Sequence, residues 1–261
     1  MPANCIRAAI WCLTLLGTTI YAETTPVKVV SFVSCPIYRD TDAGRKSGCW
    51  LAEHRALGQR FDITDASIKP ILGREILIEG IVADKPDTCG GVILNPVRVS
   101  VLPTQCPTFM LPAEKFPGRP FILPSTTLAP THSVRTPPAP PFANQSYTIF
   151  FALNSDFLMY QHSEVLLDAA VRYIEAAKPK RVIVRAYAAT KPIAVSNRKI
   201  VESIEVAEAR AAMIVEALTR LNVPRGLIKV ETLGNPSPDG ELAKQGLSEA
   251  SKRRAVVVVE L

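Results

Sequence analysis

Residues 181–187 read RVIVRAY, and residues 201–221 read VESIEVAEARAAMIVEALTRL. The first stretch is rich in β-branched residues, which favours a strand. The second stretch repeats apolar residues with the period of an α-helix, and Pro224 lies just beyond it. A strand followed by a long amphipathic helix predicts a domain that combines helices with a sheet. The expected buried face of the helix contains Ile204, Ala207, Ala211, Ile214, Leu218 and Leu221.

The flanking sequence continues this alternation in both directions. A strand is predicted at residues 147–152, followed by a helix over residues 164–177 with Ser163 as its N-cap. Two further strands are predicted at residues 227–233 and 254–261. The resulting β-α-β-α-β-β order predicts a mixed sheet with two crossover helices on one face. The expected buried stripe of the first helix is Val165, Ala169, Tyr173 and Ala176.

The first half of the chain has short strand patterns and no long helical periodicity. In residues 75–82, apolar and polar side chains alternate, which is the period of a half-buried strand. We expect a small all-β sandwich or barrel over residues 23–124, which makes the whole chain α+β. Its other strand candidates are residues 27–33, 92–94, 97–102 and 121–123.

A proline-rich segment, residues 125–146, separates the two halves. Six prolines lie between Pro124 and Pro141. Proline has no backbone N–H to donate and favours extended polyproline geometry. We therefore expect a semi-stiff linker between two domains. A loop that lies along one domain is the alternative.

The N-terminus has the features of a secretory signal peptide. Arg7 is the only charged residue before Glu23, and the short apolar run that follows it ends at the small residue Ala22. This run is shorter than the roughly 20 apolar residues of a membrane-spanning helix. Cys12 lies too early, and after too bulky a pair of residues, for a lipoprotein site. We expect residues 1–22 to be removed and no transmembrane segment to remain.

Four cysteines follow the predicted signal peptide. An even number of cysteines in a chain sent to an oxidising compartment indicates disulfides. Four cysteines permit three pairings, and we favour the sequence-near pairs Cys35–Cys49 and Cys89–Cys106. A zinc site is the alternative, but no Cys-x-x-Cys or Cys–His spacing supports it. We therefore expect neither a metal nor another cofactor.

Composition argues against two classes of function. The formal net charge of +6 is spread over both halves without a basic block, so nucleic-acid binding has no support. The sequence contains no nucleophile elbow, no metal motif and no convergent pair of acids. We therefore predict no catalytic residues and a protein that is not an enzyme.

Four stretches of the second half resemble landmarks of the OmpA-like C-terminal domain family, in the family's order. They are similar to its opening strand and turn, its second strand, its arginine-bearing helix and its closing segment. The resemblance covers residues 147–261 and implies a β-α-β-α-β-β sandwich that binds peptidoglycan non-covalently through diaminopimelate. It also implies a periplasmic location, associated with the outer membrane or cell wall of a Gram-negative bacterium. The stretches are 149–155 (IFFALNS), 181–184 (RVIV), 207–215 (AEARAAMIV) and 250–256 (ASKRRAV).

The resemblance further implies where a ligand would bind. The family's arginine, which meets the ligand's carboxylate as a bidentate pair, corresponds to Arg210. The family's acid, which meets the ligand's ammonium, falls on Ala189, and the segment between the two positions is longer than in the family. The candidate ligand-binding residues are Asn154, Tyr187, Ala189, Ser203, Arg210 and Arg253.

Because the acid is missing, the expected docking on peptidoglycan would have weakened or altered ligand recognition. Glu202 or Glu205 could supply a compensating carboxylate, whereas Lys191 and Arg198 in the lengthened segment would repel an ammonium. Without the resemblance, Arg210 would be interpreted as an ordinary solvated or salt-bridged helix arginine, with Glu205 and Glu208 close by. In the same way, Tyr187 would be interpreted as a residue that packs on the sheet.

Two functional hypotheses follow from these residues. The first is a cell-envelope protein that docks on peptidoglycan through its OmpA-like domain, while the N-terminal domain binds another envelope protein. The alternative is a structural subunit of an envelope-spanning secretion or conjugation assembly, in which the OmpA-like fold serves protein contacts.

Overall fold

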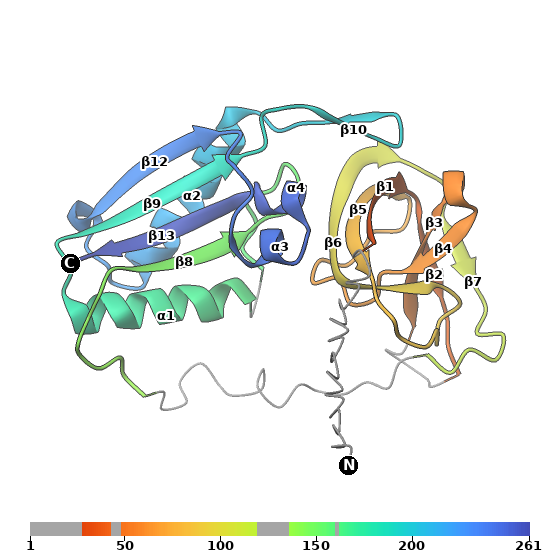
Figure 1. Ribbon diagram of the computed structural model, residues 1–261, viewed down its shortest axis with the longest axis horizontal. Helices are drawn as coiled ribbons and strands as arrows, with labels where there is room; N and C mark the ends of the chain where they lie inside the picture. The colour runs from red at the N-terminus through yellow and green to blue at the C-terminus, as the bar shows by residue number, and fades with distance from the viewer. Residues whose placement is uncertain (1–27, 43–47, 119–135, 160–161) are drawn as a thin grey trace, which may run out of the picture.

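The computed structural model describes residues 28–42, 48–118, 136–159 and 162–261, and it contains two regions (Figure 1). The N-terminal sheet region comprises residues 28–118, and the C-terminal α/β region comprises residues 145–261. The predicted signal peptide and the predicted strand at residues 121–123 lie outside the described residues.

The N-terminal sheet region is one curled seven-stranded sheet with the order β1-β5-β6-β4-β3-β2-β7 (Figure 1). The curl brings β1 against β3. There the Ser34 hydroxyl donates to the Glu53 carbonyl at 2.9 Å. Its core includes the buried side chains of Phe32, Phe61 and Ile78. The strands are β1 (Val29–Ser34), β2 (Pro36–Arg39), β3 (Cys49–His54), β4 (Gln59–Asp62), β5 (Arg74–Val82), β6 (Val92–Gln105) and β7 (Phe109–Leu111), with a short 3-10 helix at Arg55–Leu57.

Strands β1 and β5 lie close to their predicted positions, whereas β6 differs from the prediction. The two strands expected around Pro96 form one continuous strand, which passes through a cis bond between Asn95 and Pro96. The short strands β2, β3, β4 and β7 were not predicted. They have three to six residues each, which is too few to show a clear period.

The disulfide joins Cys49 to Cys89, whose Cα atoms lie 5.9 Å apart. Both predicted pairings, Cys35–Cys49 and Cys89–Cys106, are therefore wrong. The turn before β6 folds over β3, so that a Cβ on Gly91 would lie 3.2 Å from a methyl carbon of Leu51. Packing of distant strands thus brings the two cysteines together, and sequence proximity does not decide the pairing.

The C-terminal α/β region contains a four-stranded sheet with the order β12-β9-β13-β8. Strands β12 and β9 are parallel, and β13 runs antiparallel to both of its neighbours. The expected combination of sheets with few helices is confirmed. The elements are β8 (Gln145–Phe150), α1 (His162–Ala177), β9 (Arg181–Ala188), α2 (Ile204–Arg220), a 3-10 helix at Arg225–Leu227, β12 (Ile228–Gly234), the short helices α3 (Gly240–Lys244) and α4 (Ser248–Ser251), and β13 (Arg254–Glu260).

Helices α1 and α2 pack on the sheet through one apolar cluster. In α2, the four central residues of the predicted face are buried, whereas Ile204 and Leu221 at its two ends are exposed. In α1, the predicted stripe is largely wrong, because Val165 is 51% exposed and only Tyr173 of the four is buried. The side chains that α1 buries are Ser163, Leu167, Ala170, Val171, Tyr173 and Ile174.

The lengthened segment before α2 forms a hairpin, β10 (Ile193–Val195) and β11 (Arg198–Ile200). Its two turn residues, Ser196 and Asn197, both have positive φ, which is the geometry of a tight hairpin turn. The hairpin extends from the C-terminal region to the N-terminal sheet region (Figure 1). The Ser196 hydroxyl accepts the Val33 N–H at 3.1 Å, and Arg198 pairs with Glu75 at 2.8 Å.

Two apolar clusters complete the contact between the regions. One cluster joins two leucines of β5 and β6 to the β10–β11 hairpin and to the segment after β8. The other places Ile81 of β5 against the α3–α4 segment. The residues of the first cluster, called the apolar seam below, are Leu77, Leu102, Leu153, Val195 and Ile200.

The described end of the proline-rich segment lies against α1. The Tyr173 hydroxyl donates to the Ala143 carbonyl at 2.6 Å and accepts the Ala143 N–H at 2.9 Å. The Phe142 ring meets the Tyr173 ring edge-on. Among the described residues, the structure contains no helix with both the length and the apolar character needed to cross a membrane.

Candidate functional site

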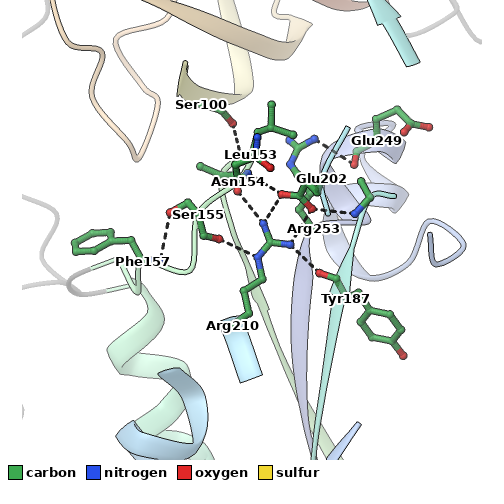
Figure 2. Close-up of polar contacts among 12 residues, drawn as sticks. Ser100, Leu153, Asn154, Ser155, Phe157, Tyr187, Glu202, Arg210, Glu249 and Arg253 are labelled. Carbon is green, nitrogen blue, oxygen red and sulfur yellow. Dashed lines mark hydrogen bonds and ion pairs between the residues drawn. The ribbon is translucent and has the colours of Figure 1, made fainter. Parts of the chain in front are cut away.

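Arg210 on α2 is fully buried and stands at the centre of the candidate site (Figure 2). A guanidinium has five N–H donors, and each of those of Arg210 has an acceptor within the chain. Nε donates to the Ser155 carbonyl at 2.9 Å. Nη1 donates to the Tyr187 carbonyl at 2.7 Å, and Nη2 to the Ala152 carbonyl at 3.0 Å. The remaining two donors meet a carboxylate.

That carboxylate belongs to Glu202, which lies between β11 and α2 and whose side chain is also fully buried. Its Oε1 accepts from Nη2 of Arg210 at 2.5 Å, and its Oε2 accepts from Nη1 at 2.9 Å. The same oxygens accept the N–H groups of Asn154 at 2.8 Å and of Ala189 at 2.9 Å. The pair is therefore bidentate, neutral overall and hydrogen-bonded at both oxygens.

Three of the candidate ligand-binding residues, Asn154, Ala189 and Tyr187, thus contact the Arg210–Glu202 pair through backbone groups. Asn154 has a φ of +52°, a conformation that asparagine tolerates better than most residues, and this places its N–H toward Glu202. Ala189 exchanges two hydrogen bonds with Glu202, since its carbonyl accepts the Glu202 N–H at 3.0 Å. The Tyr187 ring points away from Arg210 (Figure 2). It lies under the Arg254 guanidinium, whose Cζ is 4.5 Å from the ring centroid.

Ser203 lies next to this cluster but serves a different role. It is the N-cap residue of α2 and is exposed. A hydrogen bond from Ser203 to Glu205 lowers the pKa of that carboxyl. Of the two acids considered as substitutes for the missing one, the structure therefore places Glu202 on Arg210 and Glu205 at the surface.

Arg253, the last candidate residue, lies at the boundary between the regions. Its guanidinium forms an ion pair with Glu79 of β5, through Nη2 to Oε2 and through Nη1 to Oε1 at 3.3 Å. Both side chains are at least 95% buried. Burial alone would lower the pKa of Arg253, but the surrounding carboxylates, Glu79 first among them, together outweigh it and raise this pKa. Arg253 is thus held by the N-terminal sheet region.

The N-terminal sheet region also contacts the Asn154 turn directly. The Ser100 hydroxyl of β6 accepts the Leu153 N–H at 2.9 Å, with both residues buried (Figure 2). Leu153 belongs to the apolar seam. The segment that shields Arg210 on one side is therefore itself covered by the other region.

Sequence reasoning missed Glu79, although the pattern contains a signal for it. Glu79 is a charged residue in the otherwise apolar run of β5, where both neighbouring side-chain positions are buried. An isolated charge in such a run is rarely buried without a partner. The sequence alone does not show that the partner is Arg253, 174 residues later.

The sequence matches no family model and no curated protein. Among solved structures, the chain is similar to the OmpA-like domain of FopA1 from Francisella tularensis subsp. tularensis SCHU S4, with 15% identity and a TM-score of 0.35. That match covers 44% of this chain and 71% of that one. The predicted resemblance to OmpA-like domains is confirmed by such matches, and at these identities the likeness concerns the fold.

Two further matches have similar values. The cell wall anchor of the T6SS from Pseudomonas aeruginosa is 21% identical with a TM-score of 0.34, over 45% of this chain and 81% of that one. The peptidoglycan-associated lipoprotein from Burkholderia pseudomallei is 19% identical with a TM-score of 0.34, over 44% of this chain and 90% of that one.

Proposed function

We propose that this chain is a non-enzymatic cell-envelope protein whose OmpA-like region serves protein contacts, first of all with its own N-terminal sheet region. One observation carries the proposal: the arginine that would receive a ligand's carboxylate is already saturated by the chain. All five donors of Arg210 are bonded, and Glu202 occupies the position of a bidentate carboxylate.

The energetics of exchange support this role. A ligand carboxylate would have to displace Glu202 from Arg210, leaving a buried carboxylate without its cation. Removing one partner of a buried, hydrogen-bonded charge pair costs about 2–5 kcal/mol. The ligand would also have to displace the segment that Ser100 and the apolar seam hold in place. The closed arrangement is therefore the favoured state.

The N-terminal pattern and the disulfide support a proposal for the compartment. Residues 1–22 have the features of a signal peptide, and the Cys49–Cys89 bond suits an oxidising compartment. We place the protein in the periplasm of a Gram-negative bacterium, near the outer membrane or cell wall. Its proposed organisation is a signal peptide, a β-domain over residues 23–124, a linker over residues 125–146 and an OmpA-like domain over residues 147–261.

Docking on peptidoglycan is the second candidate, and one observation favours it. Glu202 places a carboxylate beside Arg210, whereas Ala189 offers none. An acid and an arginine together are what a zwitterionic group such as diaminopimelate requires. Two of the similar structures are named as a cell wall anchor and as a peptidoglycan-associated lipoprotein. This candidate requires the Arg210–Glu202 pair to open.

Sedimentation with purified diaminopimelate-type sacculi tests the two candidates. We expect the wild-type protein to stay in the supernatant, as a matched protein without an OmpA-like fold does. Pelleting that a soluble diaminopimelate-containing stem peptide abolishes would contradict the proposal and support docking. Competition by the peptide is the decisive control, because it needs no substitution at the buried pair.

A variant at the boundary sharpens the same test. Glu79→Gln removes the charge that holds Arg253 and weakens the contact between the regions. If this variant pellets competitively while the wild type and Glu53→Gln, an exposed control on β3, do not, the N-terminal region masks a wall-binding site. If neither the wild type nor either variant pellets with the sacculi, the proposed role of the OmpA-like region in protein contacts is supported.

A further inference from the structure

Cys35 and Cys106 are the two free cysteines among the described residues, and both are half-buried. Because Cys49 bonds to Cys89, each of these two has the other as its one possible intramolecular partner within the described residues. The two cysteines can bond only if the fold brings their thiols together.

The sheet register does bring them together. Cys35 directly follows β1, whose last residue Ser34 pairs with Ile76 of β5. Cys106 directly follows β6, whose last residue Gln105 pairs with Arg74 of β5. The Cys106 N–H also donates to the Gly73 carbonyl at 3.0 Å, just before β5 begins. The two cysteines therefore flank the beginning of β5 from its two sides.

The side chains meet across this strand end. Burial raises the pKa of the Cys106 thiol to about 12, and a hydrogen bond to Cys35 and the nearby charge of Glu75 add to the effect. A thiol–thiol contact of this kind places the two sulfur atoms side by side. The raised pKa disfavours the Cys106 thiolate, which is the reactive form of a thiol.

Cys35 is accessible through a cavity of about 380 Å³ between the N-terminal sheet region and the β10–β11 hairpin. The wall includes Cys35, His54, Glu75 and Arg198. Such a space admits a small disulfide compound to Cys35, whereas Cys106 does not line it. Access from this cavity therefore favours Cys35 as the first of the two sulfur atoms to react.

We propose that Cys35 and Cys106 form a second disulfide by exchange with a small disulfide-bonded oxidant such as oxidised glutathione. The Cys35 thiolate attacks one sulfur of the oxidant, forming a mixed disulfide and releasing one thiolate. The Cys106 sulfur then attacks the Cys35 sulfur of the mixed disulfide, its proton passes to the second leaving thiolate, and the intramolecular bond forms. Two protein thiols are oxidised and one disulfide compound is reduced to two thiols.

The proposed bond would have a structural consequence at the contact between the regions. It would tie the ends of β1 and β6 together, directly beside Val33 and Glu75, which hold the hairpin. In sequence, the loop closed by Cys35 and Cys106 would enclose the loop closed by Cys49 and Cys89. Of the three pairings that four cysteines permit, this is the one with one disulfide loop inside the other. The proposal does not depend on the function proposed above.

Peptide mapping of the full chain tests the bond directly. The protein is reduced, equilibrated with oxidised glutathione, alkylated under denaturing conditions and digested with trypsin without reduction. Arg39, Arg55 and Arg98 separate the four cysteines into different peptides. We expect the Cys35 and Cys106 peptides to be joined, with a mass two hydrogens below their sum, and the Cys49 and Cys89 peptides to be joined likewise.

Single variants control for misassignment. Cys35→Ser should leave Cys106 alkylated, and Cys106→Ser should leave Cys35 alkylated or carrying glutathione, with Cys49–Cys89 intact in both. In the reduced wild type, alkylation should reach Cys35 before Cys106. Wild-type protein whose Cys35 and Cys106 both remain alkylated after oxidation would overturn the proposal, as would intermolecular links in place of the intramolecular one.

Discussion

Two buried arginine–glutamate pairs close the candidate site in different ways. Arg210 and Glu202 lie within the C-terminal α/β region, eight residues apart in sequence. Arg253 and Glu79 join the two regions. Arg210 has an acceptor for every donor, whereas Nε of Arg253 has no partner in the part of the chain that the structure describes. One arginine is saturated from within its own region, and the other depends on a neighbouring region.

The surroundings of the two pairs add to this difference. Arg98 faces Glu79 across the β5–β6 ladder. Burial and the nearby Arg253 lower the pKa of Arg98 to about 10, although Glu79 acts in the opposite direction. Glu79 thus lies close to two arginines at the boundary, whereas Glu202 forms its ion pair with one. We infer that the internal pair is the stronger element and that the boundary is the easier one to open.

The largest effect is expected from removing Glu202. In Glu202→Ala, Arg210 would keep its charge in a buried site without a counter-ion, which costs about 3–5 kcal/mol. The N–H groups of Asn154 and Ala189 would lose their acceptor as well. Urea unfolding measures the change in unfolding free energy, with Glu208→Ala, an exposed glutamate on α2, as the control. Equal urea-unfolding curves for the two variants would show that the Arg210–Glu202 pair contributes nothing to the free energy of unfolding.

A smaller effect is expected at the boundary. Glu79→Gln keeps an acceptor near Arg253 but removes the charge, and hydrogen bonds to charged groups contribute about 1.5–3 kcal/mol. The same urea titration measures the loss of unfolding free energy in Glu79→Gln, with Glu53→Gln as the surface control. A loss larger than that of Glu202→Ala would reverse the ranking of the two pairs.

The smallest effect is expected at the hairpin. Arg198 is 51% exposed where it meets Glu75, and exposed ion pairs contribute about 0.2–1 kcal/mol. Arg198→Ala should therefore lower the unfolding free energy slightly at low salt. At ~1 M salt, where the screening length is about 3 Å, the difference from wild type should be much smaller. A salt-independent loss would indicate that packing of the hairpin, and not the charge, holds the contact.

The elements that could be predicted from the sequence have strong local signals. Strand β9 follows from its β-branched residues, and the inner face of α2 follows from side-chain periodicity, because a face that packs on a sheet must be apolar. Strand β5 lies where it was predicted, but the expected half-buried alternation is wrong, because residues 76–81 are all buried. The stripe of α1 was misjudged because Val165 and Leu167 are both apolar, and the pattern alone does not say which of them points inward.

The missed features depend on contacts between segments distant in sequence. Arg210 was identified through its motif, but its saturation results from three carbonyl groups and Glu202, which only the folded chain assembles. The Cys49–Cys89 bond depends on the packing of β3 against the turn before β6. The β10–β11 hairpin has the turn residues Ser196 and Asn197 as its local signal, yet its partners Val33 and Glu75 lie in the other region.

The guanidinium of Arg210 offers the most direct test of the central claim. Its side-chain N–H signals can be followed by ¹⁵N NMR in the full chain while a diaminopimelate-containing stem peptide is added. The closed site predicts signals that are protected from exchange with water and that do not move at any peptide concentration. A saturable shift of the Arg210 signals, absent on addition of a stem peptide with lysine in place of diaminopimelate, would contradict the claim.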